Sequence, residues 1–355
     1  MSENEEGNQA PITASGKHVA VLGGGSFGTA MAKVLAENGH TVHFWMRDQA
    51  QADEIRDTGC NSRYMPDVKL DGDIQTTTDL KEAVGKADTV LVAIPSKAFR
   101  AVIRENSDAF HDGQVVVSLT KGIEEHGFKL MSEILLEEIP RCRIGVLGGP
   151  NLAGEIVSRD LTATTIAAKD PNVRNIVQEL LGCEYFRVYA NVDVYGVELA
   201  GALKNIYAII AGMAAAKNLG ENAKAMLITR GLAEMSRFAV SLGANPMTFM
   251  GLAGVGDLIV TCTSSKSRNY RVGYAVGQGK DLDDAVTELG QVAEGIYTLK
   301  LVKEKSESIG IYMPLVRGLY EILYDGASIN AVINSLMMSV QNSDVEFILP
   351  RTISQ

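Results

Sequence analysis

Lys204 is the residue in this sequence best suited to move a proton. It lies in Val194–Ala216, an apolar stretch typical of one long buried helix, and its neighbours three and four positions away are Ala200, Gly201, Tyr207 and Ala208. A lysine among small and apolar side chains is costly to keep charged, so its pKa falls toward the range useful for general acid–base catalysis. Two other interpretations stay open: a lysine that extends past the core to solvent, and one paired with Glu198 or Glu234.

A second lysine and an aspartate stand at positions where they could assist. Lys121 directly follows the apolar run Gln114–Leu119 and precedes a glycine, which fits either a cation facing substrate or cofactor phosphate or a solvated loop lysine. Asp257 ends the turn Gly254-Val255-Gly256 before another apolar run. Its carboxylate would orient a lysine, bind a substrate hydroxyl, or cap a helix, which is the commoner role for aspartate at such a position.

The stretch Thr263–Tyr270 is dense in hydrogen-bond donors and fairly basic. Arg268 offers a planar fork of N–H groups, and Ser267 and Asn269 flank it, a mixture that suits a phosphate monoester. The alternative is a solvated polar loop.

A glycine-rich turn near the start of the chain suits a dinucleotide. The apolar run Val19–Leu22 leads into Gly23, Gly25 and Gly28, and an apolar helical pattern follows. In such a strand–turn–helix unit the first glycine makes the turn, the second lets the backbone approach a pyrophosphate, and the third lets helix and strand pack closely. The anion would bind free N–H groups at the positive end of the helix dipole.

The end of the next predicted strand, Thr41–Trp45, bears on which nicotinamide cofactor is used. A carboxylate at this place binds the ribose 2′-hydroxyl in NAD-preferring sites. If the strand stops at Trp45, Met46 takes that place and Arg47 is free to pair with a 2′-phosphate; if the register slips by two, Asp48 becomes the ribose ligand. We favour the first interpretation, which predicts that NADP is at least tolerated. The alternative is that Arg47 is a solvated surface arginine.

Further apolar runs alternate with helical patterns and place suggestive loops at one edge of a sheet. The predicted strands are Asp88–Ile94, Gln114–Leu119, Arg143–Leu147, Thr162–Ala168 and Tyr185–Tyr189. Ligands of open α/β sheets gather beyond the carboxyl ends of the strands. Pro95-Ser96, Lys121 and the Gly148–Asn151 loop are therefore expected beside the glycine turn.

After Asn191 the sequence pattern changes from strand-like apolar runs to long helical patterns rich in alanine, glycine and methionine. We predict an α/β protein in which an N-terminal Rossmann-like dinucleotide-binding domain (17–190) precedes an all-α C-terminal domain (191–355). Residues 1–16 are polar and acidic and are interpreted as a disordered tail.

Bulk properties exclude several classes of protein. A length of 355 residues favours two domains, and the net charge of −10 argues against a nucleic-acid partner. The four cysteines are far apart, so no metal site is expected, and reduced thiols suggest a cytoplasmic protein. Val194–Ala216 contains Glu198 and Lys204, so stable membrane insertion is not expected.

Taken together, these residues resemble the NAD(P)-dependent glycerol-3-phosphate dehydrogenase family. The stretches that carry the resemblance run in order from about Lys17 to Met338: Gly23–Gly28, Asn61–Asp67, Pro95-Ser96, Lys121–Glu124, Gly149–Ala153, Gly196–Tyr207, Asn222–Gly231, Gly254–Asp257, Ser267–Asn269 and Glu294-Gly295. The block around Lys204 is the most specific.

The resemblance implies roles for individual residues. Lys204 matches the proton donor to the carbonyl oxygen of dihydroxyacetone phosphate, and Lys121, near the nicotinamide, and Asp257 complete the catalytic set. The positions implied to bind substrate are Lys121, Gly149, Asn151, Asp257, Ser267, Arg268 and Asn269. Those implied to bind cofactor are Gly23, Gly25, Ser26, Phe27, Gly28, Arg47, Pro95, Lys121, Ala153, Arg268, Val292 and Glu294. Many bacterial members have a serine where this chain has Asn151.

The implied activity is reversible hydride transfer from NADPH or NADH to dihydroxyacetone phosphate, giving sn-glycerol 3-phosphate for glycerophospholipid synthesis. The resemblance also suggests a homodimer. Two alternatives are another two-domain dehydrogenase of the β-hydroxyacid or ketopantoate type, and a non-catalytic NADPH sensor. The Ser267–Asn269 stretch argues against the first, and the presence of Lys121, Lys204 and Asp257 together argues against the second.

Overall fold

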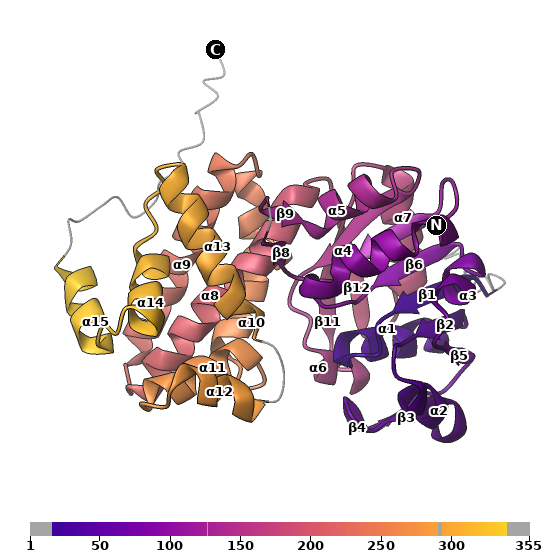
Figure 1. Cartoon of the computed structure of the whole chain (residues 1–355), viewed down its shortest axis with the longest axis horizontal. Coiled ribbons are helices and arrows are strands. Elements are labelled where there is room, and N and C mark those ends of the chain that lie inside the picture. The colour runs from indigo at the N-terminus through magenta and orange to yellow at the C-terminus, as the bar shows by residue number, and fades with distance from the viewer. Residues whose placement is uncertain (1–15, 126, 290–292, 339–355) are drawn as a thin grey trace, which may run out of the picture.

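The computed structural model describes residues 16–125, 127–289 and 293–338 and contains a sheet-based half and a helical half (Figure 1). In the first half, strands of one large sheet alternate with helices. These elements are β1 (His18–Leu22), α1 (Ser26–Glu37), β2 (Thr41–Trp45), α2 (Gln49–Thr58), β5 (Ile74–Thr77), α3 (Leu80–Gly85), β6 (Thr89–Val92), α4 (Ser96–Glu105), β7 (Val115–Ser118), α5 (Met131–Glu138), β10 (Arg143–Gly148), α6 (Ala153–Val157), β11 (Thr162–Ala167), α7 (Pro171–Leu181) and β12 (Phe186–Asn191).

The sheet order is β12-β11-β10-β7-β6-β1-β2-β5. From β5 to β10 neighbouring strands are parallel, β11 runs antiparallel to β10, and β12 is parallel to β11. The strand order reverses between β1 and β6, which places the ends of these two strands at the crevice where open α/β sheets bind ligands. The predicted α/β fold with a Rossmann-like first part is confirmed.

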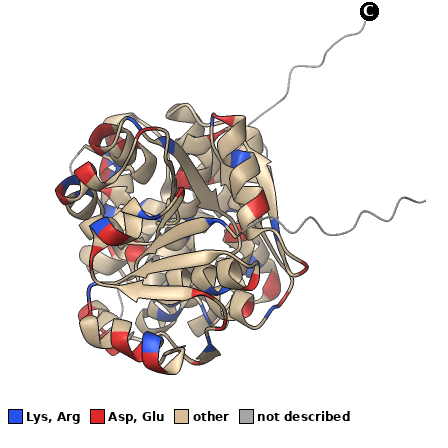
Figure 2. Cartoon of the chain, turned by 90° about the vertical axis from the view of Figure 1, so that its right-hand side faces the viewer, with Lys and Arg blue, Asp and Glu red and all other residues tan. Residues whose placement is uncertain are grey.

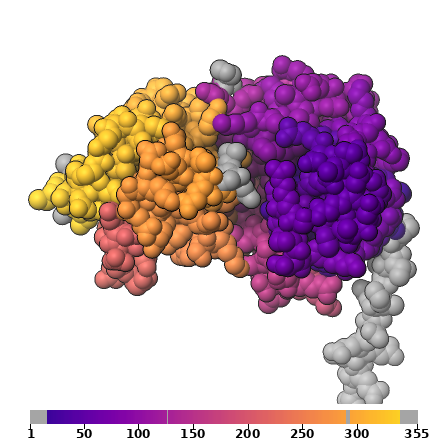
Figure 3. All heavy atoms as spheres, turned by 60° about the horizontal axis from the view of Figure 1, so that its bottom comes forward, coloured from indigo at the N-terminus to yellow at the C-terminus, as the bar shows by residue number. Residues whose placement is uncertain are grey.

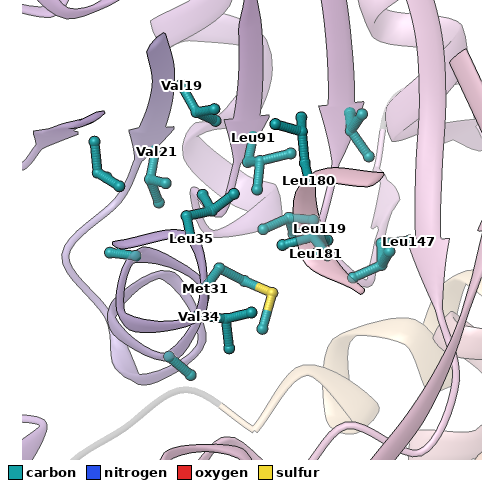
Figure 4. Packing of buried hydrophobic residues seen from close by; sticks show 14 of the residues in the cluster. Val19, Val21, Met31, Val34, Leu35, Leu91, Leu119, Leu147, Leu180 and Leu181 are labelled. Atoms are coloured by element: carbon teal, nitrogen blue, oxygen red, sulfur yellow. The ribbon is translucent and has the colours of Figure 1, made fainter. Parts of the chain in front are cut away.

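Apolar layers cover both faces of the sheet. On one face Met31, Val34 and Leu35 of α1 and Leu180 and Leu181 of α7 pack against strand residues (Figure 4). Helices α3, α4 and α5 supply a separate cluster on the other face. Strands buried on both faces read as continuous apolar runs, which is why the sequence identified them.

The sequence did not predict several short strands of the structure. The strand β5 and the two small antiparallel pairs, β3 (Cys60–Asn61) with β4 (Met65–Lys69) and β8 (Ile123–Glu124) with β9 (Lys129–Leu130), were not predicted. Elements of two to five polar-rich residues have too few apolar positions to show a period.

The helical half surrounds one long helix, α8 (Val194–Ala216), as predicted. The other elements are α9 (Glu221–Ser241), two short helical segments (Pro246–Met250 and the π-helical Leu252–Gly256), α10 (Asp257–Thr263), α11 (Arg268–Gly277), α12 (Leu282–Leu289), α13 (Glu294–Ser308), α14 (Pro314–Tyr324) and α15 (Ile329–Met337). Helix α8 is long and apolar enough to cross a membrane, yet 78% of its most apolar window is buried inside the protein. That burial is typical of a core helix.

Helices α8 and α11 cross at a glycine contact. A Cβ atom on Gly212 would overlap the backbone of Tyr270, and one on Gly273 would overlap the carbonyl oxygen of Ile209. Without side chains at these two positions the backbones approach closely, and α11 is thereby held against the helix that carries Lys204.

The β8–β9 hairpin belongs to the first half by sequence but packs into the second. Ile123 and Leu130 join the apolar core around α8, and the ring of Phe128 meets that of Phe238 edge to face, with centroids 6.0 Å apart. Figure 1 shows the hairpin between the two halves, and Figure 3 shows the two halves side by side.

The face seen in Figure 2 mixes both signs of charge. Along the ribbon in this view, Lys and Arg residues (blue) are interspersed with Asp and Glu residues (red).

Candidate active site

The glycine turn between β1 and α1 has free backbone donors. Gly23 takes φ +120°, Gly25 is the N-cap of α1 without a side-chain cap, and no atom lies within 4 Å of where a Cβ on Gly25 would be. A Cβ on Gly28 would overlap the Gly23 carbonyl. The first N–H groups of α1, including those of Ser26 and Phe27, have no partner within the helix and suit a phosphate. The turn therefore fits a pyrophosphate.

Asn61 fixes this turn from outside, a role that sequence reasoning missed. Its amide nitrogen donates to the Gly24 carbonyl at 3.0 Å and to the Thr29 hydroxyl at 2.7 Å, and Gln51 also donates to Gly24 at 2.6 Å. These bonds hold the Gly24 carbonyl on the side of Asn61, so this carbonyl does not compete for the N–H groups at the start of α1. Only its place in the family-like block Asn61–Asp67 indicated that it mattered.

Strand β2 ends at Trp45, so the first of the two cofactor interpretations fits the structure. Met46 is buried and the Arg47 side chain is exposed. Asp48 instead caps α2, accepting hydrogen bonds from the N–H groups of Ala50 and Gln51 at 3.0 and 3.4 Å. The slipped register that would make Asp48 the ribose ligand is wrong, because its carboxylate already serves the helix.

Lys204, Asp257 and Lys121 meet where the two halves join. The Lys204 ammonium bonds one oxygen of Asp257, and Lys121 Nζ lies 2.6 Å from the other. Asp257 is fully buried and Lys204 is 6% exposed, whereas the Lys121 side chain is 21% exposed. One buried carboxylate thus holds two lysines that are 83 positions apart in the chain (121 and 204).

Burial lowers the pKa of Lys204, and the positive charge of Lys121 lowers it further, against the opposing effect of Asp257. The predicted cause of the shift is therefore present. The alternative pairing with Glu198 or Glu234 is wrong: Glu198 accepts from Ser132, and Glu234 accepts from the N–H groups of Leu315 and Val316. The exposure of Lys204 likewise excludes a lysine that reaches solvent.

Thr261 completes the surroundings of Lys204 and was also missed. Its hydroxyl donates to the Asp257 carbonyl at 2.6 Å and accepts from Lys204 Nζ at 2.7 Å. The signal was present, because residues four apart on a helix share a face, and Asp257 begins α10. Asp257 is the first residue of that helix and Gly256 its N-cap, so the capping interpretation of Asp257 is wrong.

The loop after β10 forms another wall. Lys121 Nζ donates to the Gly149 carbonyl at 3.2 Å, and Gly201 of α8 faces the aliphatic stem of Lys121. Gly149 takes φ +129°, a conformation that favours glycine. Asn151, two residues on, donates from its amide nitrogen to Thr164 at 2.9 Å.

The predicted phosphate stretch forms the start of α11. Ser267 is its N-cap and accepts from the Tyr270 N–H at 3.3 Å, while Arg268 and Asn269 lie in the first turn. Asn269 accepts from the Gly295 N–H at 3.0 Å, which leaves its amide nitrogen as a donor. Lys266, from the same polar stretch, pairs with Glu155 of α6 at 2.9 Å.

The remaining predicted cofactor residues lie around these elements. Pro95 caps α4 at the end of β6, and Phe27 and Ala153 pack against the same core cluster. Burial raises the pKa of Glu294. The positive charges of Arg268 and Lys121 and the hydrogen bonds from Ser96 act in the opposite direction and favour the charged form. Val292 lies outside the described residues. Within the described ranges, no group of three or more His, Cys, Asp and Glu side chains is arranged to hold a metal ion.

Comparison with known proteins adds independent findings. The family models described as "NAD-dependent glycerol-3-phosphate dehydrogenase N-terminus" and "C-terminus" match residues 18–174 and 193–334. A Pseudomonas fluorescens protein named "Glycerol-3-phosphate dehydrogenase [NAD(P)+]" is 58% identical over 93% of this chain and 96% of its own length.

Two relatives of solved structure are similar over nearly the whole fold. The Coxiella burnetii glycerol-3-phosphate dehydrogenase is 36% identical with a TM-score of 0.87, over 92% of this chain and all of that one. The yeast enzyme (Saccharomyces cerevisiae) is 28% identical with a TM-score of 0.80, over 90% and 99% of the two chains.

Proposed function

Because the chain belongs to the NAD-dependent glycerol-3-phosphate dehydrogenase family, we propose that Lys204 is the group that exchanges a proton with the substrate oxygen during the family reaction. The protein is an NAD(P)-dependent oxidoreductase that interconverts sn-glycerol 3-phosphate and dihydroxyacetone phosphate. The observation that carries the proposal is the meeting of two lysines on the buried carboxylate of Asp257.

Lys204 has the geometry of a proton donor held in one orientation. An ammonium has three N–H bonds. Two are engaged by Asp257 and Thr261, the acceptors that the described residues supply to Nζ, and the third is available for a ligand. Since burial makes the charged form costly, giving a proton to a developing alkoxide relieves that cost.

Lys121 and Asp257 support this transfer in different ways. Lys121 is held by Asp257 and by the Gly149 carbonyl, so its charge stays beside Lys204 and stabilises negative charge that develops on a substrate oxygen. Asp257 keeps both ammonium groups in place. No carboxylate other than that of Asp257 is paired with Lys204 among the described residues, so its position governs the site.

The bound nicotinamide cofactor supplies the hydride or accepts it. This chain holds the cofactor through the N–H groups at the start of α1, and the exposed Arg47 is suited to a 2′-phosphate. We therefore propose NADPH as the preferred reductant.

The start of α11 is the proposed phosphate site. Ser267, Arg268 and Asn269 combine a guanidinium, an amide donor and the positive end of a helix dipole. Phosphate binding there is remote from the reacting carbon and positions that carbon against the lysines.

We further propose that the enzyme acts as a cytoplasmic homodimer that supplies glycerophospholipid synthesis and does not insert stably into membranes. Burial of most of α8 supports the last point. Light scattering on the purified full chain is expected to give twice the mass of 38.1 kDa; the mass of one chain would contradict the dimer.

A turnover assay tests the proposed roles. We expect the wild type to oxidise NADPH when dihydroxyacetone phosphate is added, and Lys204→Ala to lower kcat by about 10²–10⁴-fold while NADPH binding, followed by cofactor fluorescence, is preserved. Lys33→Ala is the matched control, since Lys33 is a buried lysine of α1 paired with Glu37; it should keep kcat.

Near-normal kcat in Lys204→Ala would remove its assigned role. NADPH binding without turnover by the wild type would favour a sensor, and turnover of only unphosphorylated ketones would favour another dehydrogenase class.

A further inference from the structure

The side-chain oxygen of Asn151 is a buried acceptor with no donor. Three buried side-chain polar atoms lack a hydrogen-bond partner among the described residues, and Asn151 Oδ1 is one of them. The other two, His40 Nε2 and Tyr207 Oη, lie outside the loop that follows β10. Buried acceptors are normally satisfied, so an unsatisfied one beside a ligand site indicates a donor on the ligand.

Asn151 lies at the wall of the lysine site. Its loop includes Gly149, whose carbonyl accepts from Lys121, and Pro150, which approaches Gly256 directly before Asp257. Asn151 is therefore two residues from the backbone carbonyl that accepts from Lys121.

Thr164 decides which end of the Asn151 amide faces away from the sheet. Thr164 is fully buried on β11, beside the end of β10, and its hydroxyl donates to the Gly148 carbonyl at 2.9 Å. A hydroxyl has one hydrogen, so toward Asn151 it can only accept. The amide nitrogen must therefore point at Thr164, at 2.9 Å, and the amide oxygen must point the other way.

We propose that Thr164 is a positioning residue that presents the Asn151 oxygen as an acceptor for a free hydroxyl on the substrate. This inference rests on the proposed function. The phosphate occupies the start of α11 and the reacting oxygen faces Lys204, so the hydroxyl that remains is the one on the unphosphorylated terminal carbon. The pair Thr164–Asn151 then makes the enzyme select ketone phosphates that carry this hydroxyl, because an analogue without it leaves a buried acceptor unpaired.

Two ketones that differ only in this hydroxyl provide the test. Dihydroxyacetone phosphate has it, and hydroxyacetone phosphate has a methyl group in its place. We expect the wild type to prefer the first in kcat/KM by at least about tenfold. Thr164→Val keeps the shape of the side chain but removes the hydroxyl, and it should lower kcat/KM for dihydroxyacetone phosphate by about tenfold or more while leaving that for hydroxyacetone phosphate within about twofold.

Two further variants complete the test. Thr164→Ser keeps the hydroxyl and should retain the wild-type preference. Asn151→Ala leaves the sheet untouched and should lose the preference in the same way as Thr164→Val, which keeps the test decisive if the valine variant does not fold. NADPH affinity should remain within about twofold in all three.

Equal losses with both ketones in Thr164→Val and Asn151→Ala would overturn the proposal, because a merely structural role affects both substrates alike. A fall in NADPH affinity with an unchanged preference would also overturn it and assign the acceptor to the cofactor's carboxamide. A wild type that is inactive on dihydroxyacetone phosphate would overturn the proposed function itself. A wild type that turns over both ketones equally well would overturn only the present proposal.

Discussion

The charge on Lys204 should set opposite pH dependences for the two directions of the reaction. Reduction needs the protonated amine as acid, and oxidation needs the neutral amine as base. Because burial lowers the pKa of Lys204 well below its ordinary range, this change in protonation falls within a measurable interval. We expect kcat for reduction to fall, and kcat for oxidation to rise, as pH increases from about 6 to about 10. Stopped-flow rates of both directions measure this, and parallel profiles would contradict it.

Arg47 gives a prediction about the cofactor. Arg47→Asp replaces a cation by an anion where the 2′-phosphate is proposed to bind, and should lower the NADPH-to-NADH ratio of kcat/KM by at least about tenfold. Arg56→Asp makes the same charge change on the exposed side of α2 and should leave the ratio unchanged. An unaltered ratio in Arg47→Asp would exclude the phosphate contact.

At the scale of single residues, the sequence predicted the chemical types but not their partners. Lys204 and Lys121 could each be singled out from their sequence neighbours. Their shared partner, Asp257, could not, because that pairing depends on how α8 and α10 pack against the sheet edge. The sequence offered Asp257, Glu198 and Glu234 as partners of Lys204, since sequence distance does not show which carboxylate the fold brings near. The role of Asp48 depends on a local feature, since its side chain caps α2.

Among the elements, long ones with a strong period were predictable. The predicted bounds of Thr41–Trp45 and Val194–Ala216 agree with β2 and α8, because consecutive apolar residues fix a buried strand or helix. The contact between α8 and α11 was not predictable, since nothing in the sequence shows which glycines face each other.

That contact yields a stability prediction. Gly273→Ala adds a Cβ that would overlap the Ile209 carbonyl, so α11 must move, at a cost of about 1–3 kcal/mol or more in the free energy of unfolding. Gly85→Ala is the control, because no atom lies within 4 Å of its Cβ position and its φ is not positive. Urea unfolding monitored by circular dichroism measures both; equal midpoints would show that the crossing tolerates a methyl group.

Across the whole molecule, Glu198 links the two halves. It lies on α8, is buried, and accepts hydrogen bonds from the N–H and hydroxyl of Ser132 on α5. Burial raises the pKa of Glu198 to about 7, against the hydrogen bonds from Ser132. A pKa raised by folding means that this group contributes stability below its unfolded pKa of about 4.3 and loses it as pH rises through about 7.

Glu198→Gln mimics the protonated acid and should remove that loss. We expect the variant to be more stable than the wild type by about 3 kcal/mol at pH 8 and nearly equal to it at about pH 4. Glu105→Gln, at an exposed position, should show no such pH-dependent difference. Urea midpoints at the two pH values decide the matter, and a glutamine variant that is less stable at pH 8 would refute the assignment.

The placement of the β8–β9 hairpin bears on how such a chain could be recombined in evolution. Residues 123–130 are encoded with the first half, yet Ile123 and Leu130 fill the core of the second. An exchange of genes with a junction near residue 190 would pair a foreign helical half with a hairpin shaped for the original one. A working chimera would therefore need the helical half and the hairpin to be inherited together, and the same hairpin begins two residues after Lys121.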